Sequence, residues 1–548
     1  MSGSGQGGQL GTAETADDSA GVPRGGVSWV YASTLSVTLG GALFYLYLAR
    51  VLPLGELGAV VILQAFAFIL ATGAALGLGR GFQHFLSYHR ARGELPVVRT
   101  LLGMSYVTTA LLSLVAVGVA VSLSGELGFL LFHSRQYTPA VELLSVFSGL
   151  LTAEMILAGV LLGIQRYTAY SVVVVLGSVT MYGFPILLFA LSPNVQSIVL
   201  GWILGGVVQT SASVVMIQRL TLPLRSSRDR SPTPLGARYR SLFTYSAPVL
   251  ASLLITTGTY YIDRLILASL VNLPTVGVYN YAILFASASL FVVSPFAAIL
   301  VSRISALFGR GESATIRALV RTSNTLVVLV FVPLALALAA LGPFLLRYIV
   351  GAAFVGASLP MAVLLVISAL FVPFTILVSL ATGTRRTSVI MVSSSSALLG
   401  NAVLSVALVP HIGMLGAALG NSAMFWAPFI VLYISLRSTG LVEYDVRSIS
   451  RIWAAASAGA VSVGVPLVLL HYSPILVPVF FALGAGVFLA SLRLLRALPS
   501  EVTEALNHHL PRWASAARPL ICWAGACDRP HDVEGREGPV SPLSVERR

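Results

Sequence analysis

Fourteen long apolar stretches divide this chain, and they constrain its fold more than any other feature. Each is close to the length of about 20 mostly apolar residues that a helix needs to cross a bilayer. Because backbone polar groups in lipid must be hydrogen-bonded internally, each stretch is predicted to be a helix. The predicted spans are 27–49, 57–79, 100–122, 141–163, 170–191, 196–218, 243–268, 276–302, 322–345, 358–381, 388–409, 412–436, 452–471 and 474–494. The sequence therefore predicts an all-α polytopic membrane protein with about 14 transmembrane helices.

All 33 basic residues are arginines, and their positions predict how the spans are oriented. If both termini are cytoplasmic, 29 of these arginines fall on the cytoplasmic side. Arg50, Arg135 and Arg347 then fall outside, and Arg264 alone lies within a span. Positive charge near span ends is retained on the cytoplasmic side. We therefore expect a multi-pass protein of the cell membrane with both termini in the cytoplasm.

The composition excludes a soluble domain. Only 10% of the residues are charged and the mean hydropathy is +0.89, whereas soluble domains carry about 25% charged residues. The net charge of +13 comes mostly from arginines in the inner loops. This pattern indicates contact with anionic membrane lipids and argues against a nucleic-acid partner.

Several kinds of catalytic site are excluded by missing residues. A Walker A motif and a lysine Schiff base both need lysine, which this chain lacks. The eight histidines form no metal-binding motif, and Cys522 and Cys527 in the C-terminal tail supply too few ligands for a metal. The short outer loops lack the acidic motif expected of a membrane glycosyltransferase or polymerase. We therefore expect no enzyme, no metal and no cofactor.

The sequence contains a repeat at an offset of about 218 residues. Arg92-Gly93-Glu94 in the loop after the second span matches Arg310-Gly311-Glu312 after the eighth. The segments 52–58 and 271–277 align at nearly the same offset, and so do Gly163 and Arg166 with Gly383 and Arg386. Each repeat holds six spans, an even number, so both enter the membrane from the same side. Parallel repeats of this kind occur in membrane transporters.

The repeat predicts how the chain is divided. The predicted parts are a disordered cytoplasmic tail (1–26), a six-helix bundle (27–218), a cytoplasmic linker (219–242), a second six-helix bundle (243–436), two further transmembrane helices (437–497) and a cytoplasmic C-terminal tail (498–548).

Three ionisable residues within the spans are the main candidates for a functional site. Glu154 lies near the middle of the fourth span, and Asp263 and Arg264 lie in the seventh. A charged group at the centre of a membrane helix costs about 2.5–3.5 kcal/mol or more, so it is normally paired or faces water. The alternative is an ion pair that only packs helices together. Asp263 and Arg264 point about 100° apart on their helix, so they do not face each other directly.

Further candidates have equally simple structural explanations. Arg50 ends the first span, where an arginine can serve only as an interfacial anchor. Tyr260 and Tyr261 could stack against a ligand or belong to the aromatic belt of the membrane. The polar side chains Gln64, Asn280 and Asn401 could line a wet cavity or hydrogen-bond between helices.

Several segments resemble polysaccharide-type flippases of the multidrug/oligosaccharidyl-lipid/polysaccharide exporter superfamily. These segments are Asp263-Arg264-Leu265-Ile266-Leu267, Val276-Gly277-Val278-Tyr279-Asn280-Tyr281-Ala282, Leu54-Gly55-Glu56-Leu57-Gly58 and Gly163-Ile164-Gln165-Arg166-Tyr167. The resemblance covers about residues 25–495. It implies two six-helix bundles in a V shape, with the fold called MATE-like after the multidrug exporters of this superfamily.

The resemblance also implies a function. Such a flippase moves a polyprenyl-diphosphate-linked oligosaccharide from the cytoplasmic to the outer leaflet by alternating access, for synthesis of surface polysaccharide or glycoprotein. Arg264, and second Arg50, would then bind the diphosphate headgroup, because a guanidinium fork suits phosphate. Asp263 or Glu154 would couple transport to protons or sodium. The expected partners are the lipid-linked oligosaccharide, membrane lipids and proteins of glycan assembly.

Other functions stay open on the sequence alone. In-span acids such as Glu154 are also expected of a cation-coupled multidrug antiporter of the same superfamily, and a scaffold without transport activity is a further alternative. Lipid II flippases of peptidoglycan synthesis are richer in arginine within their spans. The single arginine within the spans, Arg264, argues for a different lipid-linked substrate.

Overall fold

The computed structural model describes residues 24–132, 135–221, 234–290, 292–470 and 475–498. Within these ranges every regular element is a helix and no strand occurs. Fourteen of the helices are long and apolar enough to cross a membrane, which confirms the predicted number and order of spans. The protein is therefore an all-α, multi-pass membrane protein. The predicted N-terminal tail, except for residues 24–26, and the predicted C-terminal tail, except for Leu498, lie outside the described residues, and so do both cysteines.

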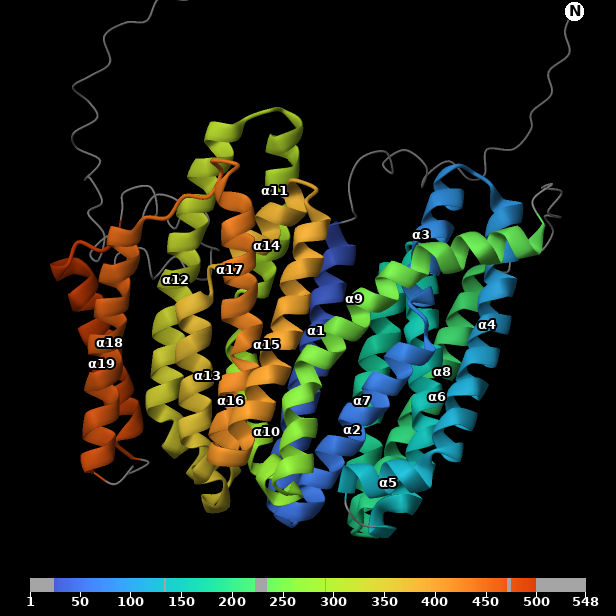
Figure 1. Ribbon diagram of the computed structural model, residues 1–548, viewed down its shortest axis with the longest axis horizontal. Coiled ribbons are helices and arrows are strands. Elements are labelled where there is room, and N and C mark those ends of the chain that lie inside the picture. Colours follow the sequence, from blue (N-terminus) through green and yellow to red (C-terminus); the bar gives the residue numbers. More distant parts are fainter. Residues whose placement is uncertain (1–23, 133–134, 222–233, 291, 471–474, 499–548) are drawn as a thin grey trace, which may run out of the picture. The chain divides into compact units, whose positions relative to one another are not determined.

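The chain forms two compact units, Met1–Gly277 and Val278–Arg548. Figure 1 labels their helices along the chain. The first unit contains α1 (Arg24–Val51), α2 (Leu54–Ala74), α3 (Leu78–Ala91), α4 (Leu95–Ser122), α5 (Ser124–Phe132), a 3-10 turn (Arg135–Tyr137), α6 (Thr138–Gly163), α7 (Tyr167–Leu191), α8 (Val195–Thr221), α9 (Leu235–Leu270) and the start of α10 (Leu273–Leu290).

The second unit continues from α10 to the end of the described chain. It contains α11 (Ser294–Gly309), α12 (Ser313–Phe344), a π-helical turn (Leu345–Val350), a 3-10 turn (Ala352–Ala357), α13 (Ser358–Phe371), α14 (Phe374–Gly383), α15 (Thr387–Ile412), α16 (Met414–Asn421), α17 (Ala423–Arg437), α18 (Val446–Leu469) and α19 (Val477–Leu494).

The predicted spans were wrong where a helix breaks inside an apolar run. The second span ends at Ala74, because the chain turns at 75–77 before starting α3. The predicted span 276–302 is split between α10 and α11, and the predicted span 358–381 is split between α13 and α14 at Val372 and Pro373. Leucine- and valine-rich turns keep the hydropathy high, so hydropathy alone does not locate these breaks.

The two repeats form the same turns. Gly93 and Gly311 both have positive φ, at 71° and 75°, a conformation that glycine adopts without strain. In each repeat the arginine and glutamate flanking this glycine lie close together, at 3.4 Å for Arg92–Glu94 and 3.8 Å for Arg310–Glu312. These matching turns give the sequence repeat a geometric basis.

A second pair of matching turns follows α6 and α14. Gln165 and Arg385 both have positive φ, at 58° and 61°. A side chain added at Gly163 would contact Leu86 of α3 at 3.0 Å, and one added at Gly383 would meet Ile304 of α11 at 2.6 Å. Leu86 and Ile304 are themselves 218 positions apart. Helix α11 is therefore the repeat counterpart of α3.

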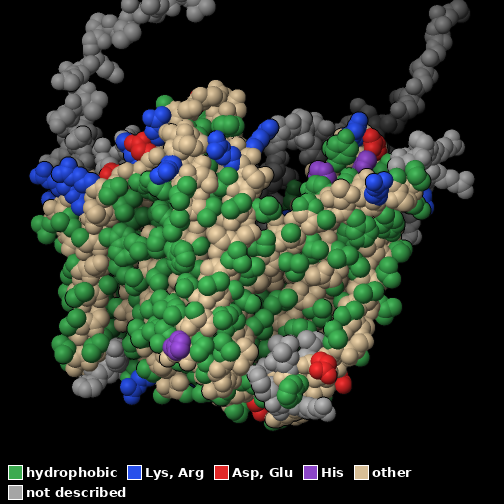
Figure 2. Space-filling model, viewed as in Figure 1, with side chains coloured by type: hydrophobic (Ala, Val, Ile, Leu, Met, Phe, Trp, Pro, Cys, Tyr) green, Lys and Arg blue, Asp and Glu red, His purple; other side chains and the backbone are tan. Residues whose placement is uncertain are grey.

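Most charged side chains gather at the helix ends, and Glu154, Asp263 and Arg264 within the spans of the first unit are exceptions. Figure 2 shows this for the visible face, where a broad hydrophobic band separates the charged ends. In the first unit the α3–α4 turn, the α6–α7 turn, the end of α8 and the start of α9 all carry arginines. Such segregation is expected where the apolar middle contacts lipid.

Helices α8 and α9 extend into the predicted linker 219–242 from both ends. Helix α8 ends at Thr221 and α9 begins at Leu235, and residues 222–233 lie outside the described part. The repeat assigns α9 to the second bundle, but α9 packs here against α2 and α3 of the first compact unit. Small residues explain this packing: a side chain at Gly77 would lie 2.7 Å from the carbonyl oxygen of Ser246.

Candidate functional site

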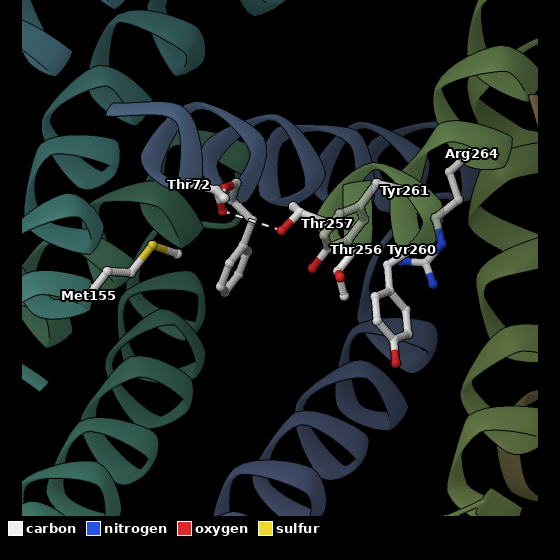
Figure 3. A pocket seen from close by; sticks show the side chains of 8 residues that line it. Thr72, Met155, Thr256, Thr257, Tyr260, Tyr261 and Arg264 are labelled. Atoms are coloured by element: carbon white, nitrogen blue, oxygen red, sulfur yellow. Dashed lines mark hydrogen bonds between the residues drawn. The ribbon is translucent and has the colours of Figure 1, made fainter. Parts of the chain in front are cut away.

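The first unit contains an open pocket of about 300 Å³ lined by three of its helices. Figure 3 shows the side chains that surround it. Helix α9 supplies most of the lining, α2 supplies two residues and α6 supplies one. The lining residues are Phe68, Thr72, Met155, Thr256, Thr257, Tyr260, Tyr261 and Arg264. Hydroxyl groups, aromatic rings and one guanidinium therefore surround a single space.

The helical repeat of α9 creates the polar face of this pocket. The pocket residues of α9 include two pairs with a spacing of four residues, Thr256 with Tyr260 and Thr257 with Tyr261. Residues with this spacing lie one turn apart on the same side of a helix. Helix α2 faces them: the hydroxyl groups of Thr72 and Thr257 are 3.4 Å apart, as the dashed line in Figure 3 marks. The pocket is thus built where α2 and α9 cross.

Arg264 supplies the positive charge of the pocket. Its guanidinium carbon lies 5.4 Å from the centroid of the Tyr261 ring, and the side chain is half-buried. Among the described residues no carboxylate lies within ion-pair distance of Arg264, and its Nε has no hydrogen-bond partner. An arginine in a membrane protein that is paired only with an aromatic face can accept an anionic group.

Asp263 does not share this environment. Its side chain is fully buried in the first unit and does not line the pocket. The structure therefore separates the two neighbouring charges onto different faces of α9, as the 100° step per residue predicts. Tyr260 and Tyr261 do line the pocket together with Arg264.

Glu154 belongs to a second polar group in the same unit, between α6 and α8. Ser213 donates a hydrogen bond of 2.9 Å to one carboxylate oxygen of Glu154, and Gln209 bonds the same carboxylate. Gln209 and Ser213 are four residues apart on α8, so both face α6. Gly177 of α7 leaves the space for Gln209, since a side chain there would lie 2.2 Å from its amide carbon. The neighbour of Glu154, Met155, lines the pocket.

The other candidate residues do not line the pocket. Gln64 of α2 accepts a hydrogen bond of 2.5 Å from the hydroxyl of Tyr45 of α1, which ties these two helices together. Arg50 lies exposed at the end of α1. In the second unit, Asn280 is buried and Asn401 is fully buried, with the Ser405 hydroxyl donating to its side-chain oxygen at 3.0 Å.

Sequence reasoning missed the threonines of the pocket and the two partners of Glu154. Thr256 and Thr257 stand in a run of small polar residues within a span, which is a usable signal. Gln209 and Ser213 have i, i+4 spacing in another span, which indicates one shared polar face. Phe68 carries no such signal, because apolar residues surround it in sequence, and Met155 is marked only by its neighbour Glu154.

Solved structures of two kinds share this fold. A lipid II flippase MurJ in an inward closed conformation matches with a TM-score of 0.66 and 13% identity, over 84% of this chain and 97% of that chain. A multidrug resistance MATE family transporter in an inward-facing conformation matches with a TM-score of 0.63 and 15% identity, over 74% and 95% of the two chains. A MATE transporter of Vibrio cholerae matches with a TM-score of 0.51 and 17% identity, over 76% and 98%. The comparison with curated proteins finds no match.

The sequence also matches the model of a protein family. The match is to the family described as "Lipid II flippase MurJ" and covers residues 84–492, which is most of the chain. The small number of arginines within the spans was an argument about the substrate, and the family match does not identify the substrate. The membrane-spanning part of this chain therefore belongs to the MurJ lipid II flippase family.

Proposed function

We propose that this protein moves a polyprenyl-diphosphate-linked oligosaccharide from the cytoplasmic to the outer leaflet of the cell membrane, with both termini in the cytoplasm. The observation that carries the proposal is the pocket in which Arg264 has no acidic partner among the described residues and faces threonine and tyrosine hydroxyls. A diphosphate needs a cation, and a saccharide needs many hydrogen-bond partners. The pocket offers both kinds of group side by side.

The physical problem of flipping explains why such a pocket is needed. Each sugar hydroxyl moved into hydrocarbon without a hydrogen bond costs several kcal/mol, and an unpaired diphosphate costs more. In a polar pocket Arg264 takes the diphosphate, and Thr256, Thr257 and Tyr260 replace water around the sugar, while the prenyl chain stays in lipid. Substrates of this class include lipid II, a disaccharide-peptide on a polyprenyl diphosphate, as well as lipid-linked oligosaccharides for surface polysaccharide.

Glu154 is the favoured coupling group in this proposal, with Asp263 as the second candidate. Glu154 lies in the same unit as the pocket, and its neighbour Met155 reaches the pocket wall. Its carboxylate is bonded by the Ser213 hydroxyl and the Gln209 amide. These groups offer few oxygen atoms to a metal ion at this place. Sodium needs several oxygen ligands, so this arrangement favours a proton. Proton uptake and release at Glu154 would then bias the α6–α8 packing.

Reconstitution into liposomes tests the proposal. A fluorescent polyprenyl-diphosphate oligosaccharide is followed between leaflets for the wild-type protein and for Arg264→Ala. We expect transfer that depends on the protein, and a loss of at least tenfold in Arg264→Ala, about the size of one charge-assisted contact. Arg347→Ala, which removes an arginine of the second unit outside the pocket, serves as the control. Wild-type transfer by folded Arg264→Ala would contradict the role of Arg264.

A cation-coupled multidrug antiporter is the second candidate function. The carboxylate of Glu154 inside the first unit favours it, because an acid within a span suits a cationic drug as well as a proton. The same liposomes distinguish the two functions. Gradient-driven uptake of a cationic dye, together with no transfer of the lipid-linked sugar, would replace the flippase proposal with the antiporter.

A further inference from the structure

Helix α3 carries an exposed line of cationic and aromatic side chains that no role in the pocket uses. Arg80, His84, Tyr88 and Arg92 are each four residues apart, so they stand on one face of the helix, and all four are exposed. We name this line the α3 stripe. It extends over about 18 Å, since each residue adds about 1.5 Å along a helix. Figure 2 shows arginine and histidine side chains grouped at this end of the unit.

Contacts along the α3 stripe hold its side chains in order. The His84 ring stacks on Tyr245 of α9, with centroids 4.5 Å apart and planes 11° apart. The Arg92 guanidinium lies over the Tyr88 ring at 5.2 Å and also donates to the Tyr88 hydroxyl. Arg80 donates to Gln83 at 3.1 Å. Side chains that are already ordered lose less entropy when they bind a ligand.

Helix α3, which carries the stripe, packs closely against the backbone of α6. A side chain at Gly79 would lie 2.2 Å from the carbonyl oxygen of Met155, and one at Gly159 would lie 2.0 Å from that of Gly79. The Ser87 hydroxyl donates to the carbonyl oxygen of Gly163 at 3.0 Å. Helix α3 thus packs directly against α6, the helix that carries Glu154.

The stripe is specific to the first repeat. The residues 218 positions later, on the counterpart helix α11 and its C-terminal end, are Ala298, Ser302, Ala306 and Arg310. Only the last arginine is shared, and in both repeats it pairs with the glutamate of the following turn. Retention of positive charge on one side of the membrane would act on both repeats alike. It accounts for Arg92 and Arg310, and equally for Arg80 within α3 and Arg303 within α11. The alignment of His84 and Tyr88 with arginines on one face of α3 needs another reason.

The N-terminal end of the α3 stripe, at Arg80, lies toward Glu154 and the pocket. Tyr170 of α7 lies within electrostatic range of both Arg80 and Glu154, and the residue after Glu154 lines the pocket. The only acid bonded to the stripe among the described residues is Glu94, which pairs with Arg92 at the C-terminal end of the stripe. Among the described residues Arg92 is therefore ion-paired, and Arg80 is not.

We propose that the α3 stripe captures the diphosphate headgroup of the lipid-linked substrate before it reaches the Arg264 pocket. This proposal rests on the proposed flippase function. Arg80, which has no ion-paired acid among the described residues, presents a guanidinium fork that suits phosphate oxygens, and the neighbouring rings of His84 and Tyr88 offer a surface for the sugar. Arg92, at the other end of the stripe, adds positive charge that attracts the anionic headgroup. Exposed cations raise the local concentration of an anionic ligand, and added salt weakens this effect.

The test compares two matched double variants of the full chain in liposomes. Arg80→Gln with Arg92→Gln removes both cations of the stripe. Arg310→Gln with Arg317→Gln removes two exposed arginines of the second repeat and serves as the control. Initial transfer rates are measured against the amount of fluorescent polyprenyl-diphosphate oligosaccharide, at low and high salt.

The stripe variant should need about tenfold more substrate for half-maximal rate, as expected for two exposed charge contacts. Its maximal rate should be unchanged, and its response to salt should be weaker than that of wild type. The control should behave like wild type. Equal half-saturation in the stripe variant and wild type, or an equal loss in the control, would overturn the assignment.

A binding measurement separates this proposal from the function on which it rests. If the wild type transfers no lipid, the flippase function fails, and binding of polyprenyl diphosphate to the detergent-solubilised protein then decides the stripe. Weaker binding by the stripe variant alone supports it, and equal binding by both variants overturns it. Competition by phosphatidylglycerol as effective as by polyprenyl diphosphate would assign the stripe to ordinary anionic lipid and overturn the proposal.

Discussion

Helices α6 and α14 occupy equivalent places in the two repeats, yet they carry different chemistry. The match of Gly163 with Gly383 sets an offset of 220 residues, which places Phe374 where α6 has Glu154. Glu154 is bonded to the polar side chains of α8, whereas Phe374 packs edge-on against Phe425 of α17, with ring centroids 5.9 Å apart. One architecture thus holds a partly buried acid in the first unit and an aromatic contact in the second.

The contact between α3 and α6 also differs from its counterpart between α11 and α14. In the first unit Gly159 of α6 lies directly against the backbone of Gly79 of α3. At the equivalent place in the second unit, Ser379 of α14 donates to the carbonyl oxygen of Ala297 of α11, at 3.3 Å. The α3–α6 crossing is the tighter one, and α6 is unbroken where Pro373 interrupts its counterpart. The first unit is therefore the one built to hold polar groups in fixed positions.

Exchanging the residues at this crossing should give the largest effect. Gly159→Ser introduces a side chain whose first carbon would lie 2.0 Å from the carbonyl oxygen of Gly79, so the backbones must separate. We expect a loss of about 3 kcal/mol or more in stability, because overpacking at backbone contacts is not easily relieved. Thermal unfolding in detergent measures it. Ser379→Gly, the reverse exchange, should lose about 1 kcal/mol or less. Equal losses in both variants would remove the difference in tightness.

Replacing Glu154 should remove coupling and leave the fold intact. Glu154→Gln keeps the shape of the side chain and its hydrogen bonds but cannot release a proton at neutral pH. We expect transfer to lose its dependence on a proton gradient, with a fall of about tenfold or more in gradient-driven rate, since a charge-assisted contact is removed. Phe374→Leu in the second unit should keep full gradient dependence. A normal gradient response in Glu154→Gln would end the role of Glu154 in coupling and turn attention to Asp263.

Displacing one partner of Glu154 should have a smaller effect. Gly177→Ala places a methyl group 2.2 Å from the amide carbon of Gln209, which can rotate away because it is the end of a flexible side chain. One hydrogen bond to Glu154 is then weakened, a change of about 1 kcal/mol, or roughly fivefold in the equilibrium it supports. The pH dependence of transfer should shift while maximal transfer changes little. An unchanged pH profile would show that Gln209 does not tune Glu154.

The matched turn ion pairs should matter least. Among the described residues, Glu94 is bonded by His89 and Arg92, whereas Glu312 pairs with Arg310 alone. All of these groups are at least partly exposed, so Glu94→Gln should cost no more than about 1 kcal/mol and Glu312→Gln less. Unfolding midpoints of the two variants give the comparison. A loss of several kcal/mol in either would mean that these turns contribute more than exposed ion pairs do.

Much of this architecture could be predicted from the sequence, because lipid imposes strong rules. The length of the apolar runs and the alternation of arginine gave the number and order of the 14 spans. Arg264 was singled out because a charge within a span is rare, and Tyr260 and Tyr261 because tyrosines cluster there; all three line one pocket. The breaks at Leu290 and Pro373 were not predicted, since hydropathy stays high across them.

The partners of the candidate residues could not be predicted in the same way. Gln209 and Ser213 are far from Glu154 in sequence, and only helix packing brings them together. The close approach of Gly79 and Gly159 is equally a property of the fold, since each glycine alone is unremarkable in a membrane helix. Which face of α9 turns toward the pocket also depends on its contacts with α2 and α3.

Photo-crosslinking tests most directly whether the first unit holds the substrate. A polyprenyl-diphosphate oligosaccharide with a photoreactive group on its sugar is bound to the reconstituted protein, irradiated, and the modified peptides are identified by mass spectrometry. We expect modification of α9 between Thr256 and Arg264 and of α2 near Thr72, and loss of both in Arg264→Ala. Modification confined to the region of Phe374 and Phe425, with none on α9, would contradict it.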